Sequence, residues 1–400
     1  MFFSGGGTRA AALSYGVLQE LAQTRVPGDG HPRRLLDDVE SISAVSGGSF
    51  TAAYYCLYHD RIFSDFESRF LKRNINDALI RDFLTPTNWP KLLSPYYGRS
   101  DLAADYYDRH LFDGATYQDL LKAGGRPYLV INATDMANEE QFPFIQTRFD
   151  FISSNVDNFP IARAVAASSA VPLLLTPITL RNYFGMPGSA RLDLHLSQPA
   201  EAVSSHRESS VWQIMHSYAD FKERPYIHLV DGGTSDNLGL QSLLDESLIF
   251  GGLREIMERS RLATPKKLVL IVVNAAVHRG AESNKKESIP GMVTVLDQLT
   301  DNWNDRIDYQ SLELFRQTLE DWRRQAINKA SGGAVDKRPD YYLVTVNFEK
   351  LSDPNDRTFF EDLPTSFHLP SSTVDKLTEV GRSLLRQSNE YQRLLRDLGR

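Results

Sequence analysis

A serine followed by two glycines is the first feature of this sequence that could do chemistry. Ser46 follows the β-branched stretch 39–45, precedes Gly47 and Gly48, and leads into a helical pattern. A sharp turn from strand to helix exposes a serine hydroxyl and needs small neighbours, because the turn is strained and crowded. Ala44 stands where the usual G-x-S-x-G pattern has its first glycine. The spacing predicts a nucleophilic serine, and a plain serine–glycine loop is the alternative.

An aspartate followed by two glycines could supply the base that such a serine needs. Asp231 ends the apolar segment 226–230, and Gly232 and Gly233 let another backbone come close. A carboxylate in that position would be partly desolvated, which raises its basicity and suits it to accept a serine proton. An aspartate that only starts a glycine turn is the alternative for this motif.

Histidine is the usual base for a serine nucleophile, but none of the nine histidines is a compelling candidate. His228 lies on the strand before Asp231, too far back to reach the end of that strand. The polar stretch 185–224 is interpreted as an insertion and contains three further histidines: His195, His206 and His216. The sequence therefore favours a serine–aspartate pair, and a triad with one of these histidines is the rival hypothesis.

A glycine loop near the start is the third candidate group: Gly5, Gly6, Gly7, Thr8 and Arg9. Successive glycine amides at a helix N-terminus can point at one negative charge. A phosphate loop would need Lys-Ser/Thr after the last glycine, and a dinucleotide fingerprint would need a glycine at Ala10. An oxyanion hole for acyl transfer is the better interpretation, with Arg9 near a carbonyl or an anionic headgroup.

The elements around these motifs favour a parallel sheet covered by helices. Strand–turn–helix occurs twice in the first sixty residues, and further strands are expected at 128–134, 226–230, 268–274 and 341–348. Helices are expected over 10–23, 160–170, about 293–330 and, as one amphipathic terminal helix, 371–399. Parallel sheets bind ligands at the carboxyl ends of their strands, so the three motifs are expected to meet there.

Composition sets broad limits on the class of protein. The chain has 400 residues, 42% of them hydrophobic, and no convincing linker, so we expect one domain over 1–400. Its motifs lie within 1–275, and 276–400 would add a strand and helices to the same core. The net charge of −7 argues against broad nucleic-acid binding. The single cysteine, Cys56, allows no intrachain disulfide.

Membrane contact is expected to be peripheral, because no apolar run approaches the ~20 residues of a membrane span. No signal peptide is visible, but only Phe2 and Phe3 precede the glycines as strand residues. We therefore expect that native residues are missing before Met1. The stretch 83–98 carries Trp89, Tyr96 and Tyr97, whose rings favour an apolar–aqueous boundary. We predict that its residues 83–97 lie beside the active-site mouth and touch lipid, with an ordinary core-capping loop as the alternative.

Taken together, the motifs resemble those of the patatin-like phospholipase family, which combines G-G-G-x-R, G-x-S-x-G and D-G-A/G in this order. They read SGGGTRA at 4–10, AVSGG at 44–48 and DGG at 231–233. INATD at 131–135 and IARAVAASSAVPLLLTPITL at 161–180 are also similar, so the resemblance covers about residues 1–275. Ser4 replaces an acid often found before the glycines, and Ala10 and Ala44 replace outer glycines.

The resemblance implies a three-layer α/β/α sandwich with a mainly parallel central sheet. It also implies hydrolysis of acyl esters of phospholipids, lysophospholipids or acylglycerols by a Ser46–Asp231 dyad, without metal or cofactor. The amides of Gly6, Gly7 and Thr8 would hold the oxyanion. Two rival functions stay open, a lipid-binding protein on the same fold and a nucleotide-binding α/β protein that uses the glycine loop.

Overall fold

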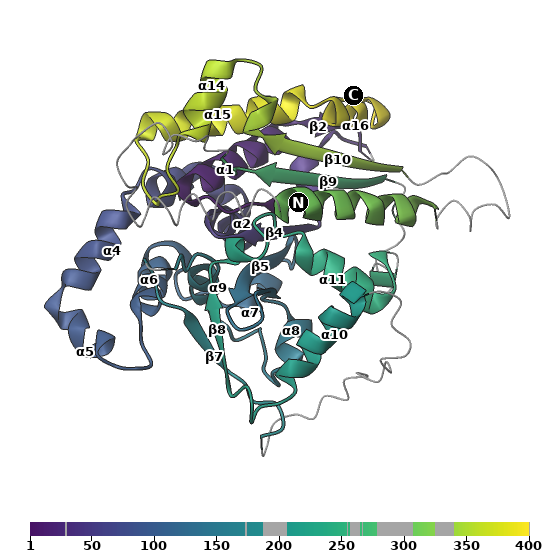
Figure 1. Ribbon diagram of the computed structural model, residues 1–400. Coiled ribbons are helices and arrows are strands. Elements are labelled where there is room, and N and C mark those ends of the chain that lie inside the picture. Colours follow the sequence, from purple (N-terminus) through teal and green to yellow (C-terminus); the bar gives the residue numbers. More distant parts are fainter. Residues whose placement is uncertain are drawn as a thin grey trace, which may run out of the picture.

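A computed structural model describes residues 1–400 except 29, 173, 187–205, 254, 257–264, 266, 278–306, 325–339 and 400. Its centre is an eight-stranded sheet in the order β10-β9-β1-β4-β5-β8-β7, with β6 paired to β5 (Figure 1). The strands are β1 Phe2–Phe3, β4 Ser41–Val45, β5 Tyr128–Asp135, β6 Glu140–Pro143, β7 Ile178–Arg181, β8 Tyr226–Val230, β9 Lys267–Asn274 and β10 Asp340–Asn347. A small second sheet pairs β2 Arg25–Val26 with β3 Arg33–Arg34.

The sheet is mixed and mostly parallel. Strands β10, β9, β1, β4 and β5 run parallel to one another. Strands β6 and β8 pair antiparallel with β5, and β7 pairs antiparallel with β8. The five strands expected from the sequence all occur within two residues of their predicted bounds. The direction of β8 departs from a purely parallel arrangement, which matters for the site because Asp231 follows this strand.

Helices cover both faces of the sheet. Those before β9 are α1 Gly7–Gln23, α2 Gly47–Tyr58, α3 Ile62–Phe66, α4 Ile75–Leu84, α5 Trp89–Leu92, α6 Arg99–Tyr107, α7 Tyr117–Lys122, α8 Gln146–Asp150, α9 Ile161–Ser168, α10 His206–Tyr218 and α11 Gln241–Phe250. A helix over 307–324 follows, and then come α14 Pro354–Glu361, α15 Ser371–Gln387 and α16 Asn389–Asp397.

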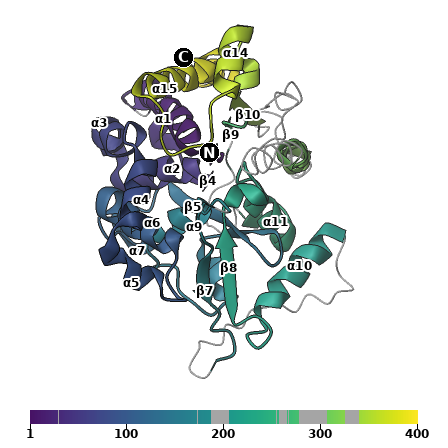
Figure 2. The same cartoon turned by 60° about the vertical axis from the view of Figure 1, so that its left-hand side comes forward.

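The alternation of side chains along the central strands creates the layers. Phe2 and Val272 face a cluster that includes side chains of α11 and of the helix over 307–324. Their neighbours Phe3 and Val273 face the opposite cluster, to which α1, α2 and α15 contribute. Successive strand residues point to opposite sides of a sheet, so each face is buried by its own set of helices (Figure 2). The fold is therefore a three-layer α/β/α sandwich.

The C-terminal helix departs from the sequence-based prediction. The expected single helix over 371–399 is divided at Ser388, whose extended backbone separates α15 from α16. The Ser388 hydroxyl accepts the Tyr391 amide proton and so caps the second helix. Part of the helix expected at 293–330 is present at 307–324, and its other residues lie outside the described ranges. Of the expected insertion at 185–224, residues 187–205 lie outside them as well.

Within the described ranges, no helix combines the length and apolarity needed to cross a bilayer.

Candidate active site

Ser46 occupies a strained turn between β4 and α2. Its backbone has φ 46° and ψ −119°, a conformation that L-residues avoid. The turn is held by the Ser46 amide, which donates to Ser168 Oγ at 2.8 Å. Strain of this kind persists only where surrounding contacts fix it, and here it directs a serine side chain off the end of a buried strand.

Gly47 and Gly48 are required by close backbone packing beneath the turn. A Cβ atom on Gly47 would overlap the backbone of Gly7, and one on Gly48 would overlap Ser4 and Phe3. The serine turn and the glycine loop therefore pack backbone against backbone. Ala44, which replaces the first glycine of the usual pattern, is completely buried.

Asp231 reaches Ser46 because of the strand register. Val45 pairs with Asn132 on β5, and Val230 pairs with Thr134 two residues further along the same strand. Because β8 runs antiparallel, the residue after Val230 returns toward the level of Val45. Asp231 Oδ2 thereby accepts a 2.8 Å hydrogen bond from Ser46 Oγ. The expected pair is brought together by an antiparallel strand.

The glycines after Asp231 complete this arrangement. The Gly233 amide donates to Asp231 Oδ1 at 2.8 Å, so each carboxylate oxygen has one donor. The Asp231 amide donates to the Ala170 carbonyl at 3.0 Å, which ties the turn to the end of α9. A Cβ on Gly232 would overlap the Asn132 carbonyl, which explains a glycine there.

Burial tunes the Asp231 carboxyl. Desolvation raises the pKa of Asp231 to about 6, although the hydrogen bonds from Gly233 and Ser46 act in the opposite direction. The carboxylate is therefore the dominant form at neutral pH and is more basic than that of a free aspartate. Such a group can receive a proton from the serine hydroxyl that it contacts.

The glycine loop lies beside Ser46. Phe3 on β1 pairs with Ala44 on β4, so Gly5 and Ser46 stand level, and a Cβ on Gly5 would lie 3.3 Å from Ser46 Cβ. The Gly5 amide donates to two oxygens of Asn237, the main-chain carbonyl and the side-chain Oδ1, both at 3.1 Å.

Two further amides of the loop are available. Gly6 (φ 133°) and Gly7 (φ 59°) adopt conformations that favour glycine. Their amides have no acceptor among the residues that the structure describes. Gly7 is also the first residue of α1, so its amide lies at the positive end of that helix.

Thr8 and Arg9 do not have the contacts expected from the sequence. The Thr8 amide donates to the Ser366 carbonyl at 2.8 Å, which removes it from the candidate oxyanion donors. Arg9 is buried, and its Nε donates to the Ala275 carbonyl while Nη1 donates to the Leu363 carbonyl. The guanidinium therefore binds the C-terminal part of the chain, and the expected contact with a substrate carbonyl or headgroup is not supported.

Ser168 and Asn237 are site residues that the sequence analysis did not single out. Ser168 Oγ accepts from the Ser46 amide, donates to the Asn132 carbonyl at 2.6 Å and lies 3.0 Å from Ser49 Oγ. Two adjacent serines at the end of an alanine-rich helix were a usable signal for Ser168. Asn237 follows Asp231 by six residues and carried no comparable local signal.

Within the described part of the chain, no histidine makes a hydrogen bond to Ser46 or Asp231. His228 lies 2.9 Å from Thr179 Oγ1, and His216 packs near Trp212 on α10. His195 and the side chain of His206 lie outside the described residues. The described residues also contain no group of three or more His, Cys, Asp or Glu suited to a metal ion.

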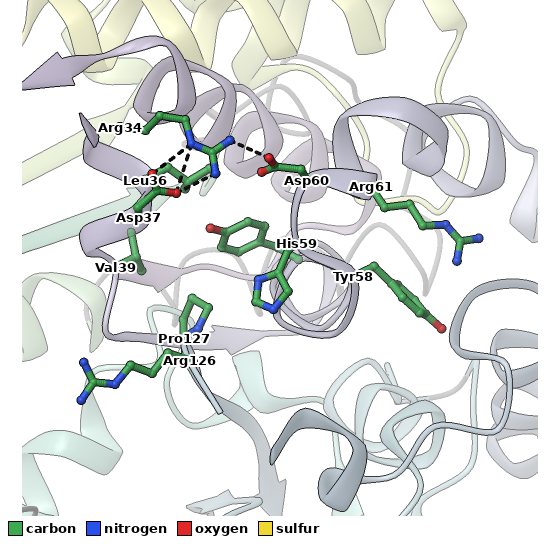
Figure 3. Close-up of a pocket in the computed structure, with 11 residues that line it drawn as sticks. Arg34, Leu36, Asp37, Val39, Tyr58, His59, Asp60, Arg61, Arg126 and Pro127 are labelled. Atoms are coloured by element: carbon green, nitrogen blue, oxygen red, sulfur yellow. Dashed lines mark hydrogen bonds and ion pairs between the residues drawn. The ribbon is translucent and has the colours of Figure 1, made fainter. Parts of the chain in front are cut away.

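A separate pocket lies at the opposite end of the sheet, where β4 and β5 begin (Figure 3). Val39 and Pro127, which precede these strands, line it together with His59, Asp60 and Arg34. Its charges are paired within the protein, since Arg34 contacts the carboxylates of both Asp37 and Asp60. The pocket is therefore distinct from the Ser46 site, which stands at the carboxyl end of β4.

Comparison with known proteins agrees with the arrangement of these motifs. Residues 1–244 match the model of the family described as patatin-like phospholipase. This range contains the glycine loop, Ser46 and Asp231. No curated protein matches the chain. The match to the family model spans more than half of the sequence, and the chain thus belongs to the patatin-like phospholipase family.

Proposed function

We propose that this protein is a lipid acyl hydrolase in which Ser46 is the nucleophile and Asp231 is the only protein base. Its substrates are carboxylic esters of phospholipids, lysophospholipids or acylglycerols. Membership of the family supports lipid acyl hydrolysis in general. The observation that carries the finer assignment is the 2.8 Å hydrogen bond from Ser46 Oγ to a buried carboxylate at a strained turn.

In the first half of the proposed reaction, Ser46 Oγ attacks the ester carbonyl carbon and its proton passes to Asp231. The amides of Gly6 and Gly7 stabilise the negative charge that develops on the carbonyl oxygen. The bond from carbon to the alcohol oxygen then breaks, and this oxygen takes the proton from Asp231. The products of this half are a free alcohol and an acyl ester on Ser46.

In the second half, water attacks the acyl carbon and gives a proton to Asp231. The bond from carbon to Ser46 Oγ breaks, and the serine oxygen recovers that proton. A fatty acid is released and both side chains return to their starting states. Asp231 thus acts as base and then as acid in each half, which suits a carboxyl whose pKa is raised to about 6 by burial.

A fluorophosphonate probe tests the nucleophile directly, because it forms a covalent bond with an activated serine. We expect labelling of the natural protein at Ser46 and none of the Ser46→Ala variant. A panel of purified lipid classes, with identification of the released products, then defines the ester. Absence of labelling together with tight lipid binding would favour the lipid-binding rival.

The nucleotide-binding rival predicts a different result. ATP or NAD would raise the melting temperature of the protein if the glycine loop held a phosphate. The loop offers few amides for that purpose, because Gly5 and Thr8 already donate within the protein. We expect no thermal shift with either nucleotide.

A further inference from the structure

A cluster of exposed apolar side chains lies on the segment formed by α4, α5 and the residues up to the start of α6. Fourteen large hydrophobic residues are exposed in the described part of the chain, and six fall within seventeen residues: Ile80, Phe83, Leu84, Trp89, Leu93 and Tyr96. Each is at least 43% exposed, and Leu93 and Tyr96 reach 85% and 87%. We call these six residues the apolar apron. Exposed apolar side chains gathered in this way mark an interaction surface.

The apron residues of α4 are not the residues that pack this helix against the core. Ile75 is buried and Leu79 packs partly buried against the main core, which accounts for one side of this helix. Ile80, Phe83 and Leu84 are exposed on the same helix, so the core leaves them uncovered. Trp89 is also exposed, so core capping does not describe its side chain.

The helix that carries the first part of the apron is linked to the loop beside the candidate active site. The base of α4 is bonded to the C-terminal loop, because the Ile75 amide donates to the Phe367 carbonyl and Asn76 Nδ2 donates to Ser366 Oγ. The Ser366 carbonyl in turn accepts the Thr8 amide of the glycine loop. Figure 1 shows α4 and α5 projecting on the side toward which the arrowheads of β9 and β10 point.

The net charge of the segment that carries the apron indicates which kind of partner binds it. Over residues 75–98 the cations Arg81 and Lys91 are balanced by the anions Asp77 and Asp82, whereas the whole chain carries −7. A neutral apolar surface gives no electrostatic preference for a polyanion or for a strongly charged protein. It suits a zwitterionic interface, and Trp89 and Tyr96 are residue types that favour the boundary between lipid and water.

We propose that the apolar apron docks this protein onto the surface of a zwitterionic phospholipid bilayer. This inference rests on the proposed function, since it names the aggregate in which the ester substrate is met. The apron enters the headgroup region while the neighbouring site faces the same lipid surface. Because apolar insertion supplies the attraction, binding persists at high salt.

Sedimentation with phosphatidylcholine vesicles tests the proposal. The Ser46→Ala protein serves as the parent, so that binding is measured without hydrolysis and independently of the catalytic assignment. We expect the additional double substitution Leu84→Glu/Leu93→Glu to lower the partition coefficient by at least about tenfold. Leu121→Glu is the matched control, because Leu121 is also an exposed leucine. It lies outside the apron, on α7, which precedes the start of β5 and not its carboxyl end. We expect this control to bind like the parent.

Several results would overturn the docking surface. The parent could fail to bind the vesicles, or the double variant could bind as well as the parent. Analytical ultracentrifugation decides whether a second copy covers the apron instead, since the double substitution would then convert a dimer into a monomer. In an otherwise natural background, the double variant should hydrolyse a short soluble ester at the natural rate, which shows that it is folded.

Discussion

Ser46 combines an unfavourable backbone conformation with a hydroxyl that donates a hydrogen bond to the Asp231 carboxylate. We predict that Ser46→Ala abolishes ester hydrolysis and lowers the free energy of unfolding by no more than about 1 kcal/mol. Loss of one hydrogen bond in a turn costs about 1 kcal/mol, and the methyl group fills the same space. Rates on a p-nitrophenyl ester and a thermal melt test this together. More than a few per cent of residual activity would refute the nucleophile assignment.

The raised pKa of Asp231 predicts a defined pH dependence for the proposed ester hydrolysis. Burial raises the pKa to about 6, so the carboxylate that can accept the Ser46 proton is lost as pH falls below this value. We predict that kcat/KM, which reports the pKa of the substrate-free protein, rises with pH to a plateau above about 7 and falls about tenfold for each unit below about 5. Asp231→Asn should lower the rate nearly as far as Ser46→Ala, and the double variant should be hardly worse than either.

Asp236 provides a control for this profile. Burial also raises the pKa of Asp236 to about 6, but its carboxylate accepts from the Gln241 and Leu238 amides and does not contact Ser46. Asp236→Asn should lower stability and leave the acid limb of the rate profile in place. A histidine variant that lost orders of magnitude while Asp231→Asn stayed active would instead support the rival triad.

Ser168 should act as a positioning residue for Ser46. Ser168→Ala leaves the Ser46 amide without its acceptor in a buried site, which costs about 1–3 kcal/mol and lets the turn relax. We predict that kcat falls at least about tenfold while KM changes little, because only the reacting geometry is affected.

The neighbouring Ser169 is a matched control for Ser168. It is equally buried, but its hydroxyl donates to the Val165 carbonyl of the preceding helix α9. Ser169→Ala should lower the melting temperature by less, because the Ser169 amide still donates to the Val165 carbonyl, and it should keep kcat. Equal losses of kcat in the two variants would show that Ser168 has only a general structural role.

At the scale of elements, local patterns were sufficient to place the strands and the loops at their ends. The segment 39–45 predicted β4, and 226–230 predicted β8 with its bounds unchanged. Ser46 and Asp231 could be paired from the sequence because each follows such a strand and precedes glycines. The position of a short apolar strand and of the turn after it can be predicted from a few adjacent residues, because the glycines mark where the strand ends.

The partners of Thr8 and Arg9 could not be predicted in this way. Their acceptors are Ala275 and residues of the loop over 363–366, at least 266 residues away in the chain. No local pattern specifies which carbonyl they meet. The direction of β8 was likewise not encoded by its alternation, because parallel and antiparallel strands can share one apolar pattern. Tertiary packing decided both features.

The contacts of Arg9 predict a role in holding this C-terminal loop against the glycine loop. Arg9→Lys keeps the charge but cannot reach the carbonyls of Ala275 and Leu363 together. Since hydrogen bonds to charged groups contribute about 1.5–3 kcal/mol each, we expect a loss of at least about 2 kcal/mol in unfolding free energy. The glycine amides should shift as well, so that kcat falls with KM nearly unchanged.

Arg386 offers a comparison for this substitution. It also joins the C-terminal part to α1, through Glu20, but it does so away from the glycine loop. Arg386→Lys should cost less stability and leave kcat intact. If Arg9→Lys instead preserved stability and only raised KM, Arg9 would bind the substrate headgroup, as the sequence pattern suggested.

At the scale of the whole molecule, the candidate site depends on residues beyond the family match. Ser46 and Asp231 lie within 1–244, but β9 pairs directly with β1, the strand that leads into the glycine loop. Helix α15 packs along α1, whose first turn is part of that loop. The C-terminal third thus packs against β1 and α1, the two elements on either side of the glycine loop, although it carries none of the three motifs.

The contact between α1 and α15 gives the last prediction. Gly16 and Gly381 let the two helices approach so closely that a Cβ on Gly381 would overlap the Leu13 carbonyl. Alanine is favoured over glycine inside a helix by about 1 kcal/mol, whereas overpacking a tight contact costs about 1–3 kcal/mol. We therefore expect Gly381→Ala to lower the unfolding free energy by about 1 kcal/mol and to reduce kcat, because α1 moves with its glycine loop.

Denaturant unfolding and ester kinetics on the same samples test this coupling. Glu379→Ala, at an exposed position two residues away on α15, should change neither quantity by a measurable amount. A Gly381→Ala protein that is more stable than the natural one and fully active would show that the helices can separate without cost. The glycine loop would then be positioned by its own contacts with Gly47 and Asn237, and the C-terminal helix would contribute only to the core.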